Sequence, residues 1–346
     1  MKSVIIVGQG IAGTVLAETL LLQGYKVYIY DQAPITSSSL VAAGVYNPII
    51  AKRITTSWMA AQLLPACQQF YTQLQAKYRT PLIHPLDLYM LFDSIEHQNN
   101  WATKATDAKY TPWIQQRPPA SPHIIQPYGG QWFTGSGYVH THTLLHQCRT
   151  QQHPQLVYIP ELFNYAHVEH TPQGVTYQNI TADYLFFCEG VQAQNNPWFD
   201  YIPFKPAKGE VLTIKVENFK ADYIIQSGVY ILPQGNDTYI VGATYNWDQI
   251  DNQTTAEGKE ELMLKVQKVI NLPFEVVAHK AGIRPAITDR RPVIGFHPQH
   301  PKLGVFNGLG AKGILLAPYF AQHLAQVLAG HMPLSKEIDV NRFLRK

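Results

Sequence analysis

At 346 residues the chain is long enough for two domains with substantial cores, and its 46% hydrophobic content is ordinary for a globular protein. Only 15% of the residues are charged and the formal net charge is +3, which is too small and too dispersed to favour nucleic-acid or membrane binding. Small molecules are therefore the expected partners.

The sequence also predicts a reduced, cytoplasmic protein. The opening apolar run at residues 4–7 is too short for a secretion signal, and no later run is long enough to span a bilayer. The cysteines are widely separated and form no Cys-x-x-Cys pair. His140, His142 and His146 lie close together in the sequence, but no carboxylate pattern accompanies them, so no metal site is predicted.

The chain is organised around its first 31 residues. The β-branched run at residues 4–7 is typical of a buried parallel strand, and Gly-Gln-Gly-Ile-Ala-Gly follows at residues 8–13. Apolar residues recur at helical spacing over residues 14–23, and a second strand at residues 26–30 ends in Asp31. Strand, glycine turn, helix, strand and acid in this order favour a dinucleotide-binding unit over a glycine-rich turn that binds nothing.

Each residue type in this unit meets a physical need. Gly8 allows a tight turn, Gly10 lets the backbone approach a pyrophosphate, and Gly13 lets the helix lie close to the sheet. The amides at the helix N-terminus face the phosphates with partial positive charge. Asp31 can accept hydrogen bonds from both ribose hydroxyls, which favours FAD or NAD over NADP.

The following segments are less regular. Residues 34–39 predict a polar loop that contains three consecutive serines, and residues 41–48 suit either a segment that passes a flat cofactor or a flexible surface loop. Residues 57–78 predict a helix with a kink at an internal proline, or two shorter helices, and residues 86–92 alternate like a strand. Residues 101–131 predict irregular structure that belongs to a second domain or a lid.

The second half of the chain predicts a largely antiparallel sheet between α/β segments. A helix is expected at residues 141–147 and an amphipathic helix at residues 260–270. β-branched and aromatic runs predict strands at residues 156–159, 175–177, 184–187, 211–216, 223–226, 229–232 and 239–243. Turn chemistry at residues 234–237 implies hairpins. A second glycine-rich loop at residues 308–313 opens a helix at residues 314–328, whose N-terminal amides also suit an anion.

Six motifs occur in the order of a known family. They are the N-terminal fingerprint, Ser38-Ser39 with Ala43-Gly44, Lys208 to Leu212, Val241 to Thr244, Gly282 to Pro285, and Gly308 to Gly313 followed by Leu316-Ala317-Pro318. Together they resemble the FAD-dependent D-amino-acid oxidase superfamily, in particular its glycine oxidase and sarcosine oxidase branch, over nearly the whole chain.

The resemblance implies an α/β fold in which a Rossmann-type FAD-binding domain carries an inserted, mainly antiparallel β-sheet substrate domain. The expected FAD-binding domain comprises residues 1–80, 136–205 and 276–346, and the substrate domain comprises residues 81–135 and 206–275. The expected FAD contacts are Gly8, Gly10, Ile11, Ala12, Gly13, Asp31, Gln32, Ser38, Ser39, Ala43, Gly44, Val45, Gly190, Gly308, Leu309, Gly310, Ala311, Lys312, Gly313 and Ile314.

The resemblance also implies how a substrate binds. Arg284 matches the family arginine that pairs with the substrate carboxylate, and Tyr230 looks like the tyrosine that glycine oxidases place beside the substrate. Lys312 is similar in position to a lysine that sarcosine oxidases use as a second carboxylate contact, and Arg53 is a poorer match that is expected to reach the site. The alternatives are a structural ion pair for Arg284, packing for Tyr230 and solvent exposure for Lys312.

Departures from the family pattern sharpen these expectations. Sarcosine oxidases attach their flavin through a cysteine near the C-terminal helix, but no cysteine follows Cys188, so non-covalent FAD is expected. Glycine oxidases have an arginine where this chain has Ala311, which puts small α-amino acids in doubt as substrates. Residues 43–48 look more like the FAD domain of the bifunctional tRNA wobble-uridine modification enzyme, which oxidises a carboxymethylaminomethyl group.

The implied reaction is oxidation of the C–N bond of a carboxylate-bearing amine or amino acid. Hydride passes to flavin N5, the imine hydrolyses, and O2 is the expected electron acceptor, giving H2O2. Two alternatives stay open: an FAD enzyme that modifies tRNA, against which the weak net charge and the lack of a basic patch argue, and a flavin-binding protein without turnover.

Overall fold

A computed structural model describes residues 1–33, 37–51, 54–117, 120–171 and 173–344, and the chain divides into two compact units. The first unit contains Met1–Leu40, Thr141–Ala207 and Ile283–Lys346, and the second contains Val41–His140 and Lys208–Gly282. The predicted FAD-binding and substrate domains have other boundaries, and their functional assignment stays a prediction.

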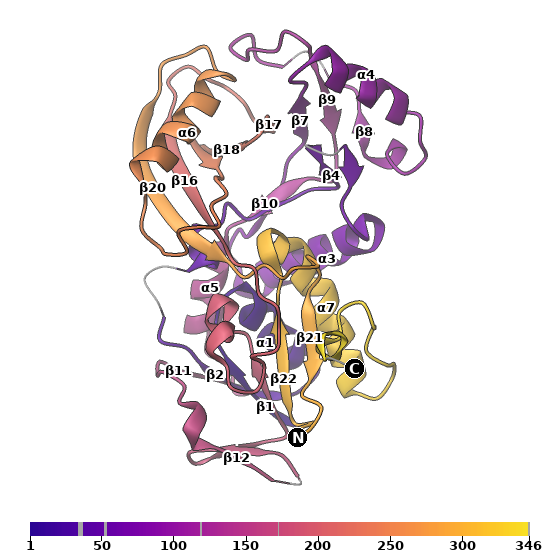
Figure 1. Cartoon of the computed structure of the whole chain (residues 1–346), viewed down its shortest axis with the longest axis vertical. Coiled ribbons are helices and arrows are strands. Elements are labelled where there is room, and N and C mark those ends of the chain that lie inside the picture. The colour runs from indigo at the N-terminus through magenta and orange to yellow at the C-terminus, as the bar shows by residue number, and fades with distance from the viewer. Residues whose placement is uncertain (34–36, 52–53, 118–119, 172, 345–346) are drawn as a thin grey trace. The chain divides into compact units, whose positions relative to one another are not determined.

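A parallel sheet forms the centre of the first unit. Over the described residues its strand order is β11-β2-β1-β15-β22-β21, and its neighbours pair in parallel except β21, which is antiparallel to β22. The early strands β1 and β2, drawn in indigo, lie in one sheet with the late strand β22, drawn in orange (Figure 1). The strands are β1 (Ser3–Val7), β2 (Lys26–Tyr30), β11 (Leu156–Ile159), β15 (Tyr184–Phe187), β21 (Val293–Phe296) and β22 (Leu303–Asn307).

Helices pack on this sheet because its strands are almost wholly apolar. Val4, Ile5 and Ile6 are completely buried, as expected for a parallel strand covered on both faces. Helix α1 packs against both the sheet and α7. The other elements of this unit are α1 (Ile11–Leu22), α2 (Ser38–Val41), α5 (Thr141–Thr150), η3 (Tyr165–His167), β12 (Val168–His170), β13 (Val175–Tyr177), β14 (Ile180–Ala182), η4 (Gly190–Asn195), η5 (Gly310–Lys312), α7 (Gly313–Leu328) and η6 (Val340–Phe343).

A largely antiparallel sheet forms the second unit, with the strand order β20-β16-β19-β18-β17-β7-β9-β8 over the described residues. β17 pairs with β7 in parallel, whereas β18 and β19 form an antiparallel hairpin. The strands are β7 (Leu88–Leu91), β8 (Ile114–Gln115), β9 (Gly130–Phe133), β16 (Ala207–Lys215), β17 (Ile224–Gln226), β18 (Tyr230–Gly235), β19 (Thr238–Gly242) and β20 (Glu275–Arg284). The smaller elements are β3 (Val45–Tyr46), β4 (Ile49–Ile50), β5 (Thr55–Thr56), β6 (Ile83–Pro85), β10 (Gly137–Val139), η2 (Thr111–Trp113), α3 (Ala60–Tyr78), α4 (Ile95–Lys104) and α6 (Ala256–Gln267).

Two apolar cores cover opposite faces of this second sheet, because alternate residues of a strand point to opposite sides. Tyr89 and Leu91 of β7 belong to the core that includes Leu262 of α6, whereas Leu88 and Met90 belong to the core that includes Ile49. The second of these cores also has Tyr230 packed against it.

The predicted α/β fold with a parallel sheet and a mainly antiparallel second sheet is confirmed. The helix predicted at residues 57–78 is a single helix, α3, over Ala60–Tyr78, and it continues through Pro65. The expectation of irregular structure from residue 101 onward is wrong at its start, because Trp101 lies in α4. Ser94 caps this helix by accepting a hydrogen bond from the His97 amide, and the buried Trp101 anchors it. None of the described helices is both long and apolar enough to cross a membrane.

Candidate cofactor and substrate site

Three glycines mark one edge of the parallel sheet. Gly8 follows β1, Gly190 follows β15 after a short turn, and Gly308 follows β22. Because these strands run parallel, their carboxyl ends meet at the same edge, which is where open α/β sheets bind ligands. The structure thus brings together the glycine-rich loops that the sequence predicted separately.

The turn after β1 admits no side chain at two of its glycines. Gly8 has φ of 94°, and a Cβ on it would lie 2.7 Å from the carbonyl oxygen of Cys188. A Cβ on Gly13 would lie 1.9 Å from the Gly8 carbonyl oxygen. Helix α1 then begins with no acidic residue in its first turn and no side-chain cap. Small residues and a helix N-terminus without an acidic side chain in its first turn fit a pyrophosphate.

Ser39 holds this loop in place. Its hydroxyl accepts a hydrogen bond from the Ile11 amide at 2.9 Å, and a Cβ on Gly10 would lie 3.1 Å from the same oxygen. Ser39 is buried, and Ser38 begins the short helix α2. The segment therefore touches the glycine turn, and the predicted contact of Ser38 and Ser39 with FAD stays a prediction.

Asp31 is fixed at the end of β2 by backbone amides. Its carboxylate accepts hydrogen bonds from Gln9 at 2.7 Å and from Ala33 at 2.6 Å. A carboxylate can accept about four hydrogen bonds, so acceptor capacity for ribose hydroxyls remains. Arg149 lies 3.8 Å from the carboxylate, and its Nε donates to the side-chain oxygen of Gln9 at 2.8 Å. The predicted neighbour Gln32 is exposed.

Asn307 joins two of the glycine loops. Its Nδ2 donates to the Gly190 carbonyl at 2.9 Å, and its Oδ1 accepts from the Gly308 amide at 2.8 Å. Gly190, Gly308 and Gly310 all have positive φ, and a Cβ on Gly310 would meet nothing within 4 Å. The predicted contact Leu309 is buried, so its backbone rather than its side chain is available to a ligand.

The second glycine loop leads into α7, which begins beside α1. A Cβ on Gly313 would lie 2.9 Å from the side chain of Ile11, so glycine permits the two helix N-termini to approach. Ala311 is exposed, Ile314 is buried and Lys312 is partly buried. Burial lowers the pKa of Lys312 to about 8. A cation held at the start of a helix suits an anionic group of a ligand.

The substrate residues predicted from the resemblance fall in both units. Arg284 ends β20 and is partly buried in the first unit, whereas Tyr230 begins β18 in the second. Burial raises the pKa of Tyr230 to about 12, so its phenol is neutral at ordinary pH. Arg53 lies outside the described residues.

The predicted FAD contacts Ala43, Gly44 and Val45 also lie in the second unit. Gly44 has φ of 72°, and a Cβ on it would lie 2.0 Å from the Val139 carbonyl oxygen. Packing against β10 is thus sufficient reason for glycine at this position, and the predicted FAD contact stays a prediction.

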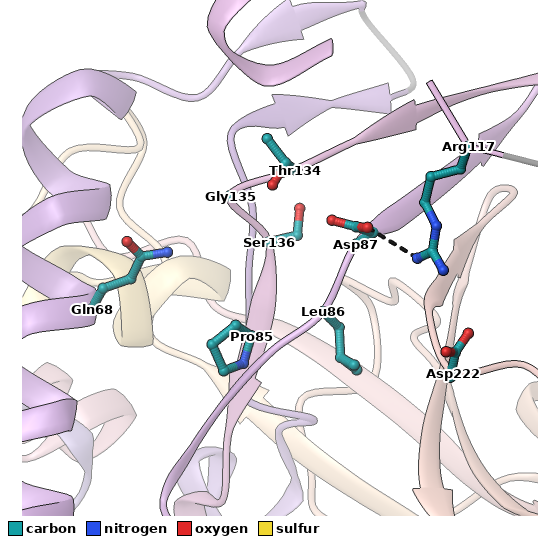
Figure 2. A pocket seen from close by; sticks show the side chains of 9 residues that line it. All are labelled: Gln68, Pro85, Leu86, Asp87, Arg117, Thr134, Gly135, Ser136 and Asp222. Atoms are coloured by element: carbon teal, nitrogen blue, oxygen red, sulfur yellow. Dashed lines mark hydrogen bonds and ion pairs between the residues drawn. The ribbon is translucent and has the colours of Figure 1, made fainter. Parts of the chain in front are cut away.

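A hollow of about 480 Å³ lies elsewhere in the second unit (Figure 2). In its wall Arg117 pairs with Asp87 at 3.0 Å, and its guanidinium lies 4.9 Å from the Trp132 ring centroid. None of the predicted site residues lines this hollow. Arg117 and Asp87 pair with each other, so we assign the hollow no part in the candidate site.

Sequence reasoning missed Gln9, Arg149 and Asn307. Asn307 had a usable signal, because a polar residue that ends a buried parallel strand lies at the ligand edge of the sheet. Gln9 stood inside the glycine motif as an unassigned position. Arg149 had no signal, since only folding brings the last turn of α5 to Asp31.

Comparison with known proteins gives the family context. The model for DAO, described as FAD dependent oxidoreductase, matches residues 3–327. Glycine oxidase of Pseudomonas putida is 26% identical over 365 residues and covers 96% of both chains. The tRNA 5-methylaminomethyl-2-thiouridine biosynthesis bifunctional protein of Marinobacter nauticus is 22% identical, covering 99% of this chain and 58% of its own. Glycine oxidase from Bacillus cereus has the same fold, with a TM-score of 0.79, 19% identity and 96% coverage of both chains.

Proposed function

Because the chain belongs to the DAO family of FAD-dependent oxidoreductases, we propose that it oxidises the C–N bond of an amine that carries a carboxylate. The family implies FAD and an amine or amino acid as substrate. The carboxylate is the finer part of the proposal. The observation that supports it most is Lys312, a partly buried cation at the N-terminus of α7, in the same unit as Arg284.

The chain's own residues bind and orient the substrate in this proposal. Arg284 holds the carboxylate through its planar fork, and Lys312 adds a second positive charge. Tyr230 contributes a neutral phenol that hydrogen-bonds to the substrate. When bound, FAD supplies the two-electron acceptor that takes hydride from the carbon next to nitrogen. Fixing the carboxylate orients that carbon, and orientation of this kind lowers the barrier by several kcal/mol.

We also propose that FAD is bound non-covalently. Cys67, Cys148 and Cys188 are all buried, and burial raises the pKa of the thiols of Cys67 and Cys188. A thiol in that state is a poor nucleophile. Precipitation with acid should therefore release all of the yellow colour into the supernatant, and colour retained in the pellet would contradict this proposal.

An anaerobic titration tests the proposed reaction. Glycine, sarcosine, D- and L-amino acids and N-carboxymethyl amines are added in turn while the oxidised-flavin absorbance is followed. We expect at least one of them to bleach the flavin. Arg284→Ala should raise the concentration needed about 100-fold, because it removes a charged, bidentate partner. Arg284→Lys should recover only part of this, and Arg79→Lys, at an exposed site, should leave the titration unchanged.

The same samples decide the electron acceptor and the main alternative. Admitting O2 to the bleached protein should restore the yellow colour and release H2O2, whereas recovery only with an artificial acceptor would make the protein a dehydrogenase. The alternative, oxidation of a modified wobble uridine, is favoured by the relative that this chain matches over 58% of that relative's length. Bleaching by modified tRNA but by no small amine would establish it.

A further inference from the structure

Two charged side chains of the first unit face each other across a gap beside the glycine turn. Arg149 Nη2 lies 3.8 Å from Asp31 Oδ1, which is close for an ion pair but too long for a hydrogen bond. An arginine and a carboxylate that meet without restraint approach to about 2.7–2.9 Å. Both side chains are partly open to solvent, with 28% of the arginine and 11% of the aspartate exposed. The fold must therefore hold the two groups apart, and a ligand can reach them.

The aspartate is held by the backbone around it. Its Oδ2 accepts from the Gln9 amide at 2.7 Å, and its Oδ1 accepts from the Ala33 amide at 2.6 Å. The hydroxyl of Tyr158, on β11, donates to the Asp31 carbonyl at 2.8 Å and so fixes the main chain as well. The carboxylate cannot move toward the arginine without lengthening these bonds.

The arginine is held from the other side by the same two neighbours. Its Nε donates to Gln9 Oε1 at 2.8 Å, and its guanidinium lies over the Tyr158 ring, 5.3 Å from the centroid. Gln9 is only 1% exposed, and its Nε2 donates to the Leu145 carbonyl of α5 at 2.8 Å. Gln9 and Tyr158 thus each contact both charged residues, and together they fix the distance between them.

A hydroxyl group is the polar group that this gap suits best. An arginine can only donate hydrogen bonds and an ionised carboxylate can only accept them, whereas a hydroxyl does both. Its oxygen can lie about 2.7–2.9 Å from Arg149 Nη2 and from Asp31 Oδ1 at the same time. A phosphate group would be attracted by the arginine but repelled by the aspartate, and a carbonyl or an ammonium group would satisfy only one of the two.

We propose that Arg149 is a second contact for the adenosine ribose of the dinucleotide, with one ribose hydroxyl donating to Asp31 and accepting from Arg149. The acid alone selects a hydrogen-bond donor, whereas the pair selects a group that donates and accepts. The inference goes beyond the proposed function, because it concerns the nucleotide half of the cofactor and holds whichever amine is oxidised. All of the residues that carry it belong to the first unit.

The probes are ADP, which is the adenosine half of FAD with its pyrophosphate, and the 2′-deoxy and 3′-deoxy analogues of ADP. Calorimetry gives the dissociation constant of each for the flavin-free full chain. The readout is the ratio of the dissociation constant of a deoxy analogue to that of ADP. A partly unfolded variant binds all three nucleotides more weakly by the same factor, so lost stability leaves the ratio unchanged.

In the wild type, the analogue that lacks the bridging hydroxyl should bind about 100-fold more weakly than ADP, because it loses two charge-assisted hydrogen bonds. In Arg149→Met the ratio should fall to about 10-fold, because only the bond to Asp31 remains. Arg149→Lys keeps the charge without the planar fork and should give an intermediate ratio. Arg290→Met removes an exposed positive charge of the same unit and should leave the ratio at its wild-type value.

Gln9→Met tests whether the gap must be held open. It removes the acceptor that holds Arg149 Nε but keeps the backbone amide that holds Asp31. The arginine can then close onto the carboxylate and occupy the place of the hydroxyl. The ratio should therefore fall to about 10-fold in this variant too.

A wild-type ratio near one for both deoxy analogues overturns the proposal, as does an unchanged ratio in Arg149→Met or Gln9→Met. Adenosine 2′,5′-bisphosphate is compared with AMP as a further check. If the bisphosphate bound more tightly than AMP and lost this advantage in Arg149→Met, the arginine would be a phosphate contact and the proposal would be wrong. If no amine bleaches the wild-type flavin, the proposed function fails, and the nucleotide ratios still decide this inference.

Discussion

A buried lysine in the second unit and a partly buried lysine in the first differ in what their surroundings do to the charge. Lys208 on β16 is 1% exposed, and its Nζ lies 2.6 Å from Asp251 and 3.9 Å from Glu210. At Lys312, before α7, burial is the cause that lowers the pKa to about 8. The comparison indicates where to look for function. A lysine whose charge is balanced by nearby carboxylates is structural, whereas a lysine whose pKa is lowered by burial is a candidate for ligand binding.

The support around Lys208 extends through Glu210. This buried carboxylate accepts from the Thr255 amide at 3.0 Å and from the Thr255 hydroxyl at 2.8 Å, and it lies 2.7 Å from His279 Nε2. Thr255 in turn caps α6. The cluster therefore ties two strands and a helix together with every oxygen of the carboxylate engaged.

The largest expected effect is the loss of this cluster. Glu210→Ala should lower the free energy of unfolding by about 3–5 kcal/mol, because it removes one of the two carboxylates beside the buried Lys208 and leaves two hydrogen-bond donors of Thr255 without their acceptor. Urea denaturation measures it. Glu217→Ala removes an exposed carboxylate that pairs with Lys215 at 3.5 Å, and should cost about 0–1 kcal/mol. If Glu210→Ala and Glu217→Ala lowered the free energy of unfolding equally, the conclusion that the Lys208 cluster is structural would be wrong.

The second effect concerns Lys312. Lys312→Met should weaken binding of acetate to the FAD-loaded protein about 10-fold, measured through the change in flavin absorbance, because it removes a positive charge. Because the wild-type lysine is charged below its pKa of about 8, acetate affinity should fall as pH rises through 8, and the variant should show no such fall. Exposed Lys336→Met is the control. A variant that unfolds easily yet binds acetate normally would make Lys312 structural.

The smallest effect tests whether a lowered pKa alone marks function. His170 and His297 of the first unit have pKa values lowered by burial and by neighbouring His300, onto which both rings stack. Their neutral forms favour the fold, so this stability is present above pH 6.5 and is lost as pH falls below it. Thermal unfolding between pH 8 and pH 5 should show the fall, and His170→Gln with His297→Gln should reduce it without altering acetate binding.

The glycine-rich part of the site could be predicted from the sequence because its rules are local. Gly8 and Gly13 lie at the close approaches that their spacing indicates, and Asp31 lies at the end of β2, since a turn, a helix start and a strand end depend on neighbouring residues. The strands at residues 26–30 and 184–187 were located for the same reason.

The remaining contacts could not be predicted, because they join distant segments. Asn47 meets Tyr230, and Arg149 meets Gln9, only after the sheets have formed. Helix α4 was not predicted, because its sequence is mostly polar and Trp101 is its one buried residue. The sequence of this segment therefore lacks the periodic apolar residues that indicate an amphipathic helix.

The strand order of the first unit also governs how this protein can be made. Val4 pairs with Tyr184, and Leu185 pairs with Leu303, so the sheet that begins at the N-terminus is completed only by the last part of the chain. At about 5–20 residues per second, a ribosome needs on the order of 15–60 s to reach that point. Until then β15 exposes an unpaired strand edge, so chaperones that cover this edge are expected to favour soluble protein.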